Sequence, residues 1–330
     1  MSEKIIVILL IFINLIIFLK FEKISKLLKL YDHPDQKRKF HKKPISILGG
    51  LIIYFSILIL FLLENFLFFQ NSFFESYQGY IFILVLSIIF LIYLYDDLNS
   101  LGPNLKLFFL IIIILFHLKF DQNLIINSLE FSFFEKELLL GNFAIPFTIF
   151  CFIIFINAFN MFDGINLQCG LYSLQLFIVL YLLTYNIFFI YLTIPVFFFL
   201  ILNYLNLCFL GNNGTSILSY VICVAIIQTY NLDIKILADE IFLFLCVPGF
   251  DLLRLAIKRI INKTHPFYPD RNHIHHILIE KYRLNKVTWI IQMLIFIPIF
   301  LNFVTEIHSI ILIIISITVY LFLVFDKKKI

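Results

Sequence analysis

Apolar stretches long enough to cross a bilayer recur along almost the whole chain, and this feature restricts the fold more than any other. A helix needs about 20 consecutive apolar residues to span the hydrocarbon core. Of the 330 residues, 62% are hydrophobic and 14% are charged, whereas soluble domains have about 45–50% apolar and about 25% charged residues. The excess of apolar residues therefore indicates membrane-spanning segments rather than a large soluble core.

We predict about eleven such segments. They lie near residues 4–20, 47–69, 79–95, 104–118, 143–159, 167–184, 187–210, 214–229, 236–253, 286–303 and 307–325. Backbone polar groups must be satisfied within each segment in lipid, which favours helices, and the runs are continuously apolar rather than alternating, which excludes a membrane barrel. The expected fold is an all-α, polytopic membrane protein formed by a single domain over residues 1–330. A β-rich loop predicts one short external hairpin near residues 123–142.

Basic residues predict the orientation of these segments. Lys and Arg concentrate at residues 23–43, at residues 258–286 and in the tail at 327–329. Cytoplasmic loops carry an excess of Lys and Arg, and with eleven spans all three regions fall on the same side, so that side is expected to be cytoplasmic. The first segment resembles a signal peptide without an A-x-A-like cleavage site, so we expect a retained anchor.

Five polar clusters fall on this cytoplasmic side. They lie at residues 32–50, 96–97, 156–170, 209–216 and 248–278. Any one of them could simply end a helix or set the topology, because isolated motif matches are often false. Their occurrence on one face, with nothing comparable on the other, indicates a functional site facing the cytoplasm.

The sequence LIYLYDDLNSLG contains the most informative cluster, the adjacent carboxylates Asp96 and Asp97. Two neighbouring carboxylates raise each other's pKa unless a cation lies near them. Mg²⁺ accepts a few carboxylates and fills its other positions with water and substrate phosphate oxygens. Asp163, with Asn157 and Asn160 at three-residue spacing before it, could supply a third carboxylate from the next loop.

The last polar cluster supplies positive charge. Arg254, Lys258 and Arg259 share one side of a predicted helix, and Arg271 follows with three histidines. Those histidines are His273, His275 and His276. Arginine matches phosphate geometry and histidine adds donors near neutral pH. An H-x-H-H run could instead bind a transition metal, but no Cys or second His group accompanies it, so we favour contacts to phosphate or sugar. Mg²⁺ together with cationic side chains suits phosphoryl transfer from a soluble donor to a lipid acceptor.

Several motifs together resemble the polyprenyl-phosphate N-acetylhexosamine-1-phosphate transferase family. They are H-K-K-P-I-S-I-L-G-G (41–50), Y-D-D-L (95–98), N-A-F-N-M-F-D-G-I (157–165), F-L-G-N (209–212) and P-F-Y-P-D-R-N-H-I-H-H (266–276). The last motif is similar to that of the undecaprenyl-phosphate GlcNAc-1-phosphate transferase-like branch of glycosyltransferase family 4. The resemblance implies a Mg²⁺-dependent enzyme, with Mn²⁺ as the alternative metal.

The same resemblance implies the reaction and its setting. A UDP-N-acetylhexosamine would donate sugar 1-phosphate to undecaprenyl phosphate, giving undecaprenyl-diphosphate-sugar and UMP, as the first membrane step of cell-envelope polysaccharide or O-antigen synthesis. The setting would be the bacterial cytoplasmic membrane, with membrane lipid but no nucleic acid as a partner. Association into a homodimer is expected only by analogy.

Residue roles follow from the resemblance, position by position. The catalytic aspartates would be Asp96, Asp97 and Asp163, with one of the first two as a candidate base. Metal ligands would come from Asp97, Asp163 and the position of Asn212. Substrate-binding residues would be His41, Asn160, Asn166, Phe209, Arg271, His273, His275 and His276.

Two positions depart from the family pattern. Asn212 stands where an aspartate that binds Mg²⁺ is expected, and Asn166 stands where an aspartate contacts uracil. An amide oxygen can accept a hydrogen bond from uracil and can ligate a hard cation, but the change at residue 212 removes a full charge. Two alternatives therefore remain beside an active transferase: a family member that binds UDP-sugar or lipid carrier without turnover, and a transporter of a phosphorylated solute.

Overall fold

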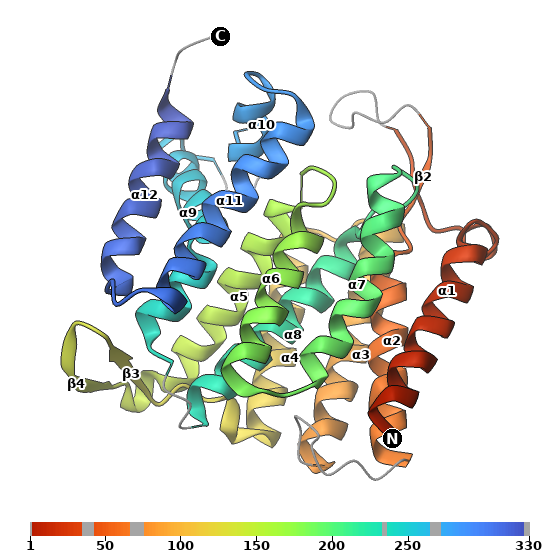
Figure 1. Ribbon diagram of the computed structural model, residues 1–330, viewed down its shortest axis with the longest axis horizontal. Coiled ribbons are helices and arrows are strands. Elements are labelled where there is room, and N and C mark those ends of the chain that lie inside the picture. Colours follow the sequence, from red (N-terminus) through yellow and green to blue (C-terminus); the bar gives the residue numbers. More distant parts are fainter. Residues whose placement is uncertain (1, 35–42, 67–75, 233–235, 265–271, 327–330) are drawn as a thin grey trace. The chain divides into compact units, whose positions relative to one another are not determined.

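The structure is a computed structural model and describes residues 2–34, 43–66, 76–232, 236–264 and 272–326. Two predicted site residues, His41 and Arg271, lie outside these ranges. The described chain is almost entirely helical (Figure 1). Its helices are α1 (Ser2–Leu28), α2 (Gly49–Phe66), α3 (Ser76–Asn99), α4 (Pro103–Phe120), α5 (Ala144–Phe162), α6 (Gln168–Thr184), α7 (Phe188–Tyr204), α8 (Gly211–Asn231), α9 (Ala238–Ile261), α10 (Ile274–Ile279), α11 (Leu284–Val304) and α12 (Ser309–Phe325).

Each of the eleven predicted segments coincides with one of these helices, so the predicted helix positions are confirmed. Helix α10 was not predicted, because its six residues, Ile274–Ile279, lie within a polar loop. Two differences in length affect the site. Helix α3 continues through Asp96 and Asp97 to Asn99. Helix α9 continues past residue 253 to Ile261, which agrees with the helix predicted for Arg254, Lys258 and Arg259.

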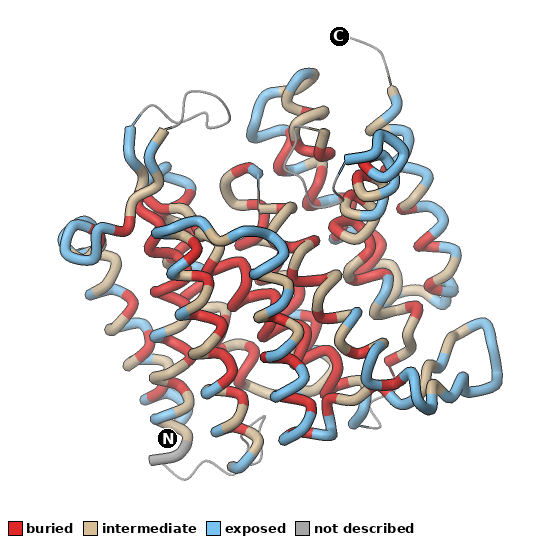
Figure 2. The backbone as a smooth tube through the Cα atoms, turned by 180° about the vertical axis from the view of Figure 1, so that it is seen from behind, coloured by how far each residue is buried: buried red, intermediate tan, exposed pale blue. Residues whose placement is uncertain are grey.

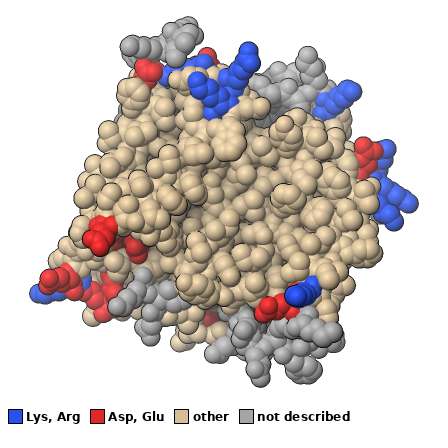
Figure 3. Space-filling model, in the orientation of Figure 1, with Lys and Arg blue, Asp and Glu red and all other residues tan. Residues whose placement is uncertain are grey.

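Five helices among the described residues are long and apolar enough to cross a membrane. They are Glu3–Leu28, Tyr77–Asn99, Pro103–Phe120, Gly141–Phe162 and Leu284–Val304. On the face seen in Figure 3, charged side chains lie near helix ends and the surface over the helix middles is uncharged. The chain therefore has the helices of a multi-pass membrane protein, while the number of eleven crossings and their orientation stay predictions.

The chain divides into two compact units, and the first consists of residues Met1–Asp121 and Ser173–Ile222. Within it α7 packs against α1 and α2, and α3 packs against α2 and α4. The rings of Tyr54 and Phe90 stack with centroids 4.1 Å apart. Buried residues on these helices alternate with exposed apolar ones, as Figure 2 shows along the tube, which is the pattern expected of helices that face lipid on one side.

The first unit also holds a small antiparallel pair of strands, β1 (Tyr31–Asp32) and β2 (Ile45–Ser46). Ser46 makes a further parallel bridge to Cys208, at the end of the turn after α7. This bridge connects the segment before α2 to the segment before α8.

The second unit consists of residues Gln122–Tyr172 and Cys223–Ile330. Within it α9 packs against α5, α11 and α12. The predicted hairpin is confirmed: β3 (Ser128–Phe131) and β4 (Phe134–Leu139) pair in antiparallel fashion between two short 3₁₀ helices, Gln122–Leu124 and Gly141–Phe143. The single-domain prediction is not tested by this division.

Asp239, at the start of α9, ties the hairpin to the helices of its unit. Its carboxylate accepts hydrogen bonds from the backbone N–H of Ser132 at 2.8 Å and from the Ser132 hydroxyl at 2.6 Å. The hydroxyl of Ser309, at the start of α12, also donates to it. One buried carboxylate thus holds the hairpin turn and two helix starts together.

Replacing Asp239 with alanine is expected to destabilise the second unit by about 1–3 kcal/mol, because buried donors lose their only strong acceptor. Thermal unfolding in detergent should show a lower midpoint, and limited proteolysis should cut the hairpin faster. Glu135→Ala, which removes an exposed carboxylate from the same hairpin, is the matched control. An Asp239→Ala protein as stable as this control would contradict the assigned role.

Candidate active site

Two glycines allow the start of α2 to approach the start of α8 in the first unit. A β-carbon at Gly50 would lie 2.3 Å from Asn213 Oδ1 and 2.5 Å from the backbone nitrogen of Gly214. The backbone N–H groups of Gly49 and Gly50 donate to the carbonyls of Phe209 at 3.2 Å and Leu210 at 3.1 Å. The Gly-Gly pair of the sequence motif is therefore required by a close backbone contact.

The chain turns into α8 at Gly211, which has a φ of +77°. This left-handed conformation is readily adopted by glycine and costs other residues energy. Any side chain here would also approach the carboxylate of Asp97, since a β-carbon would lie 2.9 Å from Asp97 Oδ2. The F-L-G-N motif thus places the first N–H groups of α8 directly against Asp97.

The Asp97 carboxylate is held by those N–H groups. The backbone N–H of Asn212 donates to Oδ1 at 2.9 Å, and that of Asn213 donates to Oδ2 at 3.1 Å. Helix N-termini carry unpaired N–H donors and a partial positive charge, which favour an anion. The start of α8 therefore stabilises the Asp97 carboxylate and offsets part of the repulsion within the Asp pair.

Asp96 is more deeply buried, at 4% exposure, and has three donors of its own. It accepts from the backbone N–H of Leu101 at 2.6 Å, from Lys106 Nζ at 2.8 Å and from the side-chain amide of Asn212 at 2.9 Å. The sequence analysis missed Lys106, ten residues further along the chain. Only a short turn joins α3 to α4. A lysine early in the second helix could therefore have been predicted to lie near the Asp pair.

Asn212 has a defined task that its sequence position alone did not suggest. Its backbone binds one carboxylate of the pair and its side-chain amide binds the other. An aspartate at this position would place a third negative charge where an N–H donor now lies. The asparagine that replaces the expected aspartate is therefore part of the hydrogen bonding around Asp96.

Phe209, the predicted uracil-stacking residue, lies in the same unit just before this turn. Its backbone N–H donates to the carbonyl of Ser46 at 2.7 Å, and its carbonyl accepts from Gly49. Its side chain is half-buried. The first unit therefore brings together four predicted residues: Asp96, Asp97, Phe209 and Asn212.

In the second unit the other predicted residues cluster around the end of α5. Asn160 lies in its last turn, Asp163 follows its last residue, and Asn166 lies in the turn that leads into α6. Leu167 has a φ of +71°, a conformation that costs a non-glycine residue about 1–2 kcal/mol and that is often found at functional sites. The three polar side chains are all half-buried.

The histidine segment packs against this turn. A β-carbon at Gly164 would lie 1.8 Å from Nε2 of His275, so glycine is needed for the ring to fit. His275 is 1% exposed, and its ring lies parallel to that of His273, with centroids 5.4 Å apart, and 4.3 Å from that of His276. The second unit thus brings the three histidines together with the Asp163–Gly164 turn.

Burial determines the charge of His275. Desolvation on burial, followed by the charges of His276 and His273, lowers its pKa to about 3, while Asp251 acts in the opposite direction. His275 is therefore neutral at pH 7. Its Nδ1 is buried without a hydrogen-bond partner among the described residues, so it offers a hydrogen bond rather than a positive charge.

Asp251, in α9, holds the histidine segment and was missed by the sequence analysis. It is 2% exposed; one oxygen accepts from Nδ1 of His273 at 2.7 Å, and the other from Tyr320, Arg254 and the backbone N–H of Ile274. Arg254 also donates to the carbonyl of Asn272 at 2.6 Å. Arg254, expected to meet phosphate, is thus bonded within the protein. An aspartate within the apolar middle of α9, three residues before Arg254, was the available signal.

The described side chains provide only some of the ligands that a metal ion would need. The described residues contain no group of three His, Cys, Asp or Glu side chains that could hold a metal ion. In the first unit, Asp97 uses one lone pair on each oxygen and retains the other. Mg²⁺ commonly takes one or two carboxylates and completes its shell with water and substrate phosphates. Asp97 therefore fits an ion that arrives with a diphosphate, but not a permanent protein-only site.

One segment of the chain matches a known family model. It contains Asp96, Asp97, the turn after α5 and the start of α8. Residues 80–230 match the family model described as glycosyl transferase family 4. The match covers somewhat less than half of the 330-residue chain.

Curated relatives extend the similarity over most of the length of the chain. It is 25% identical over 284 residues to an undecaprenyl-phosphate alpha-N-acetylglucosaminyl 1-phosphate transferase of Escherichia coli O157:H7, covering 82% of the chain and 75% of the relative. It is 27% identical over 260 residues to the transferase of the same name from Thermotoga maritima, covering 78% and 75%. These similarities agree with the resemblance predicted from the motifs.

Replacing Asn212 with aspartate should destabilise the protein in metal-free buffer. The change removes the amide donor to Asp96 and adds a like charge beside it, a repulsion of about 1–4 kcal/mol at about 4 Å. Differential scanning fluorimetry in EDTA should give a lower unfolding temperature, and added Mg²⁺ should raise it again, because a cation relieves the repulsion. Asn99→Asp adds the same charge at an exposed position of α3. This control should neither lower the unfolding temperature in EDTA nor make it rise with Mg²⁺. Equal stability of both variants in EDTA would contradict the hydrogen bonding described here.

Replacing Asp251 with asparagine should release the histidine segment. An amide cannot accept from all four donors and presents an N–H group to Arg254 or His273, so a loss of about 3–5 kcal/mol is expected. Thermal unfolding and hydrogen exchange at residues 272–276 are the measurements. Glu280→Gln makes the same chemical change at an exposed position and should leave both unchanged. Unchanged exchange in Asp251→Asn would refute its anchoring role.

Proposed function

We propose that the chain transfers an N-acetylhexosamine 1-phosphate, with N-acetylglucosamine as the expected sugar, from a UDP-sugar to undecaprenyl phosphate. The observation that carries this proposal is the Asp97 carboxylate, held by the first N–H groups of α8 within the family-matched residues 80–230. The names of the relatives support the sugar and the acceptor.

In this reaction an oxygen of the lipid phosphate attacks the phosphorus that bears the sugar. The bond from that phosphorus to the bridging oxygen breaks, UMP leaves, and the lipid diphosphate sugar remains. The product suits the first membrane step of cell-envelope polysaccharide synthesis, including O-antigen. We place the protein in the bacterial cytoplasmic membrane with the site facing the cytoplasm, where UDP-sugars are available.

The two aspartates have different roles in this proposal. Asp96 is buried and bonded to three donors, so we assign it to positioning Lys106 and Asn212. Asp97 is half-buried and retains lone pairs, which supports it as the group that faces the substrate phosphates and as the proton acceptor. Mg²⁺ is the proposed metal, held by Asp97 with Asp163 and the Asn212 amide oxygen as further candidates, and when bound it would neutralise charge on the diphosphate.

Substrate contacts are assigned to the remaining predicted residues. Phe209 would stack on uracil and Asn166 would accept its N–H. His273 and His276, with Arg271 and His41, would contact the diphosphate and sugar, and Asn160 would support the same substrate. His275, neutral at pH 7, would act through hydrogen bonding at Nδ1 rather than through charge.

A second candidate function is supported by Asn212. Because its amide donates to Asp96, the Asp pair is satisfied without a metal, as would suit a family member that binds UDP-sugar or lipid carrier without turnover. A transporter has no comparable support in the described residues.

The deciding experiment measures sugar 1-phosphate transfer by the purified full chain in detergent. Undecaprenyl phosphate, several radiolabelled UDP-N-acetylhexosamines and graded Mg²⁺ would be used with wild type, Asp97→Ala and Asn212→Asp. Wild type should form the lipid product, and Asp97→Ala should be at least about 100-fold slower, the usual effect of losing a proton-transferring group. Glu306→Ala, which removes an exposed carboxylate, should retain full activity.

Two results would replace the proposal. Turnover only by Asn212→Asp would make the natural chain a silenced transferase. Absence of turnover in every variant, with UDP-sugar still bound, would establish the second candidate function.

A further inference from the structure

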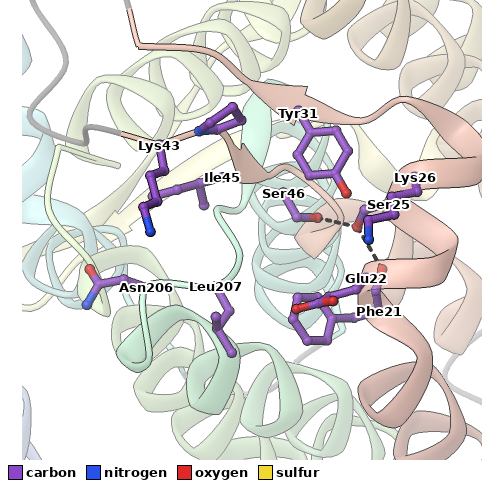
Figure 4. A pocket seen from close by; sticks show the side chains of 11 residues that line it. Phe21, Glu22, Ser25, Lys26, Tyr31, Lys43, Ile45, Ser46, Asn206 and Leu207 are labelled. Carbon is purple, nitrogen blue, oxygen red and sulfur yellow. Dashed lines mark hydrogen bonds between the residues drawn. The ribbon is translucent and has the colours of Figure 1, made fainter.

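The first unit contains a cavity of about 560 Å³ away from the residues assigned to the reaction. It lies where the last turns of α1 meet the β1–β2 pair and the turn after α7, and Figure 4 shows the side chains around it. Its volume is within the range of about 300–1,000 Å³ found for small-molecule sites. Four of its lining residues belong to the 41–50 motif, namely Lys43, Pro44, Ile45 and Ser46, but the proposed transfer reaction assigns none of them a role.

The polar side chains of the cavity wall are mainly basic. Lys26 and Lys43 contribute ammonium groups and Glu22 a carboxylate, which gives the wall one net positive charge. Figure 4 shows the Tyr31 hydroxyl and Lys26 on the side of Ser25, and Lys43 on the other side of the opening. These groups match a singly charged anion with several oxygen acceptors, such as a phosphodiester.

The rest of the wall is apolar and leads onto a membrane-length helix. Phe21 and Leu207 line the cavity, and α1 is one of the five helices apolar enough to cross a membrane. Next to the cavity along α1, Leu19 is 71% exposed and Phe12 is 58% exposed. A ligand with an anionic head and a long apolar tail could therefore place its head in the cavity and its tail along α1.

We propose that this cavity binds the phosphate headgroup of a membrane lipid. Lys26 and Lys43 bind the phosphate, the Tyr31 hydroxyl donates to it, and the apolar tail lies against α1. Basic residues near a membrane surface attract anionic lipids. The headgroup could belong to a phospholipid, which is a phosphodiester, or to a polyprenyl phosphate, which is a phosphomonoester, since both present anionic phosphate oxygens to the same cations.

The cavity is connected to the candidate active site within the same unit. Ser46 lines the cavity and hydrogen-bonds to Ser25 at 2.6 Å, and its carbonyl accepts from the N–H of Phe209 at 2.7 Å. The segment that begins at Phe209 supplies the N–H groups that bind Asp97. A bound headgroup would thus contact a strand bonded directly to the support of Asp97.

The test measures lipid binding to the purified full chain by native mass spectrometry after delipidation. The ligands are phosphatidylglycerol, undecaprenyl phosphate, diacylglycerol as the uncharged control, and inorganic phosphate as a soluble competitor. Lys26→Gln/Lys43→Gln removes both cations of the cavity. Lys20→Gln/Lys23→Gln removes two exposed lysines of the same helix that do not line it.

Wild type and the control variant should retain at least one phosphate lipid, and the cavity variant should bind it at least about 10-fold more weakly. The two lipid arms identify which source of phosphate is preferred. Equal binding by both double variants, or equal binding of diacylglycerol, would overturn the proposal. Displacement of the lipid by millimolar inorganic phosphate would reassign the cavity to a soluble anion and overturn it as well. Because the readout is binding, failure of the transferase assay would not affect this result.

Discussion

The close backbone contact between the starts of α2 and α8 is the constraint on which the acidic part of the site depends. Gly50 and Gly214 leave no room for side chains, and the resulting approach fixes where α8 begins. The first N–H groups of α8 then meet Asp97, and the Asn212 side chain meets Asp96. A pair of like charges at the end of an apolar helix is thereby stabilised by backbone donors, an amide and one lysine.

The sequence predicted most of the fold, because apolar length is a strong and local signal. All eleven predicted segments are helices, and the β-rich loop forms a hairpin. The helix ends at Asn99 and Ile261 were less predictable, since polar residues near a membrane surface are compatible with either loop or helix. Membrane crossing depends on lipid contacts, so helix positions alone do not determine the number of spans.

The sequence analysis identified most residues of the candidate site but did not predict the hydrogen bonds among them. Asp96, Asp97, Phe209 and Asn212 meet in one unit, and the histidines meet the Asp163–Gly164 turn in the other. Lys106 and Asp251 were missed because their roles arise from contacts between helices, which no spacing rule reveals. The sequence pattern also predicted that Arg254 binds phosphate. In the structure Arg254 instead pairs with Asp251 and donates a hydrogen bond to Tyr320.

The use of backbone N–H groups to hold Asp97 has a consequence for how this protein can change over evolutionary time. Every residue except proline supplies the same donor, so the identity of the side chains at positions 212 and 213 is not what retains the carboxylate. An aspartate-to-asparagine exchange at residue 212 can therefore alter the charge of the site while its architecture persists. Exchange at this position would thus change the affinity for cations and, where no cation is bound, the stability of the protein as well.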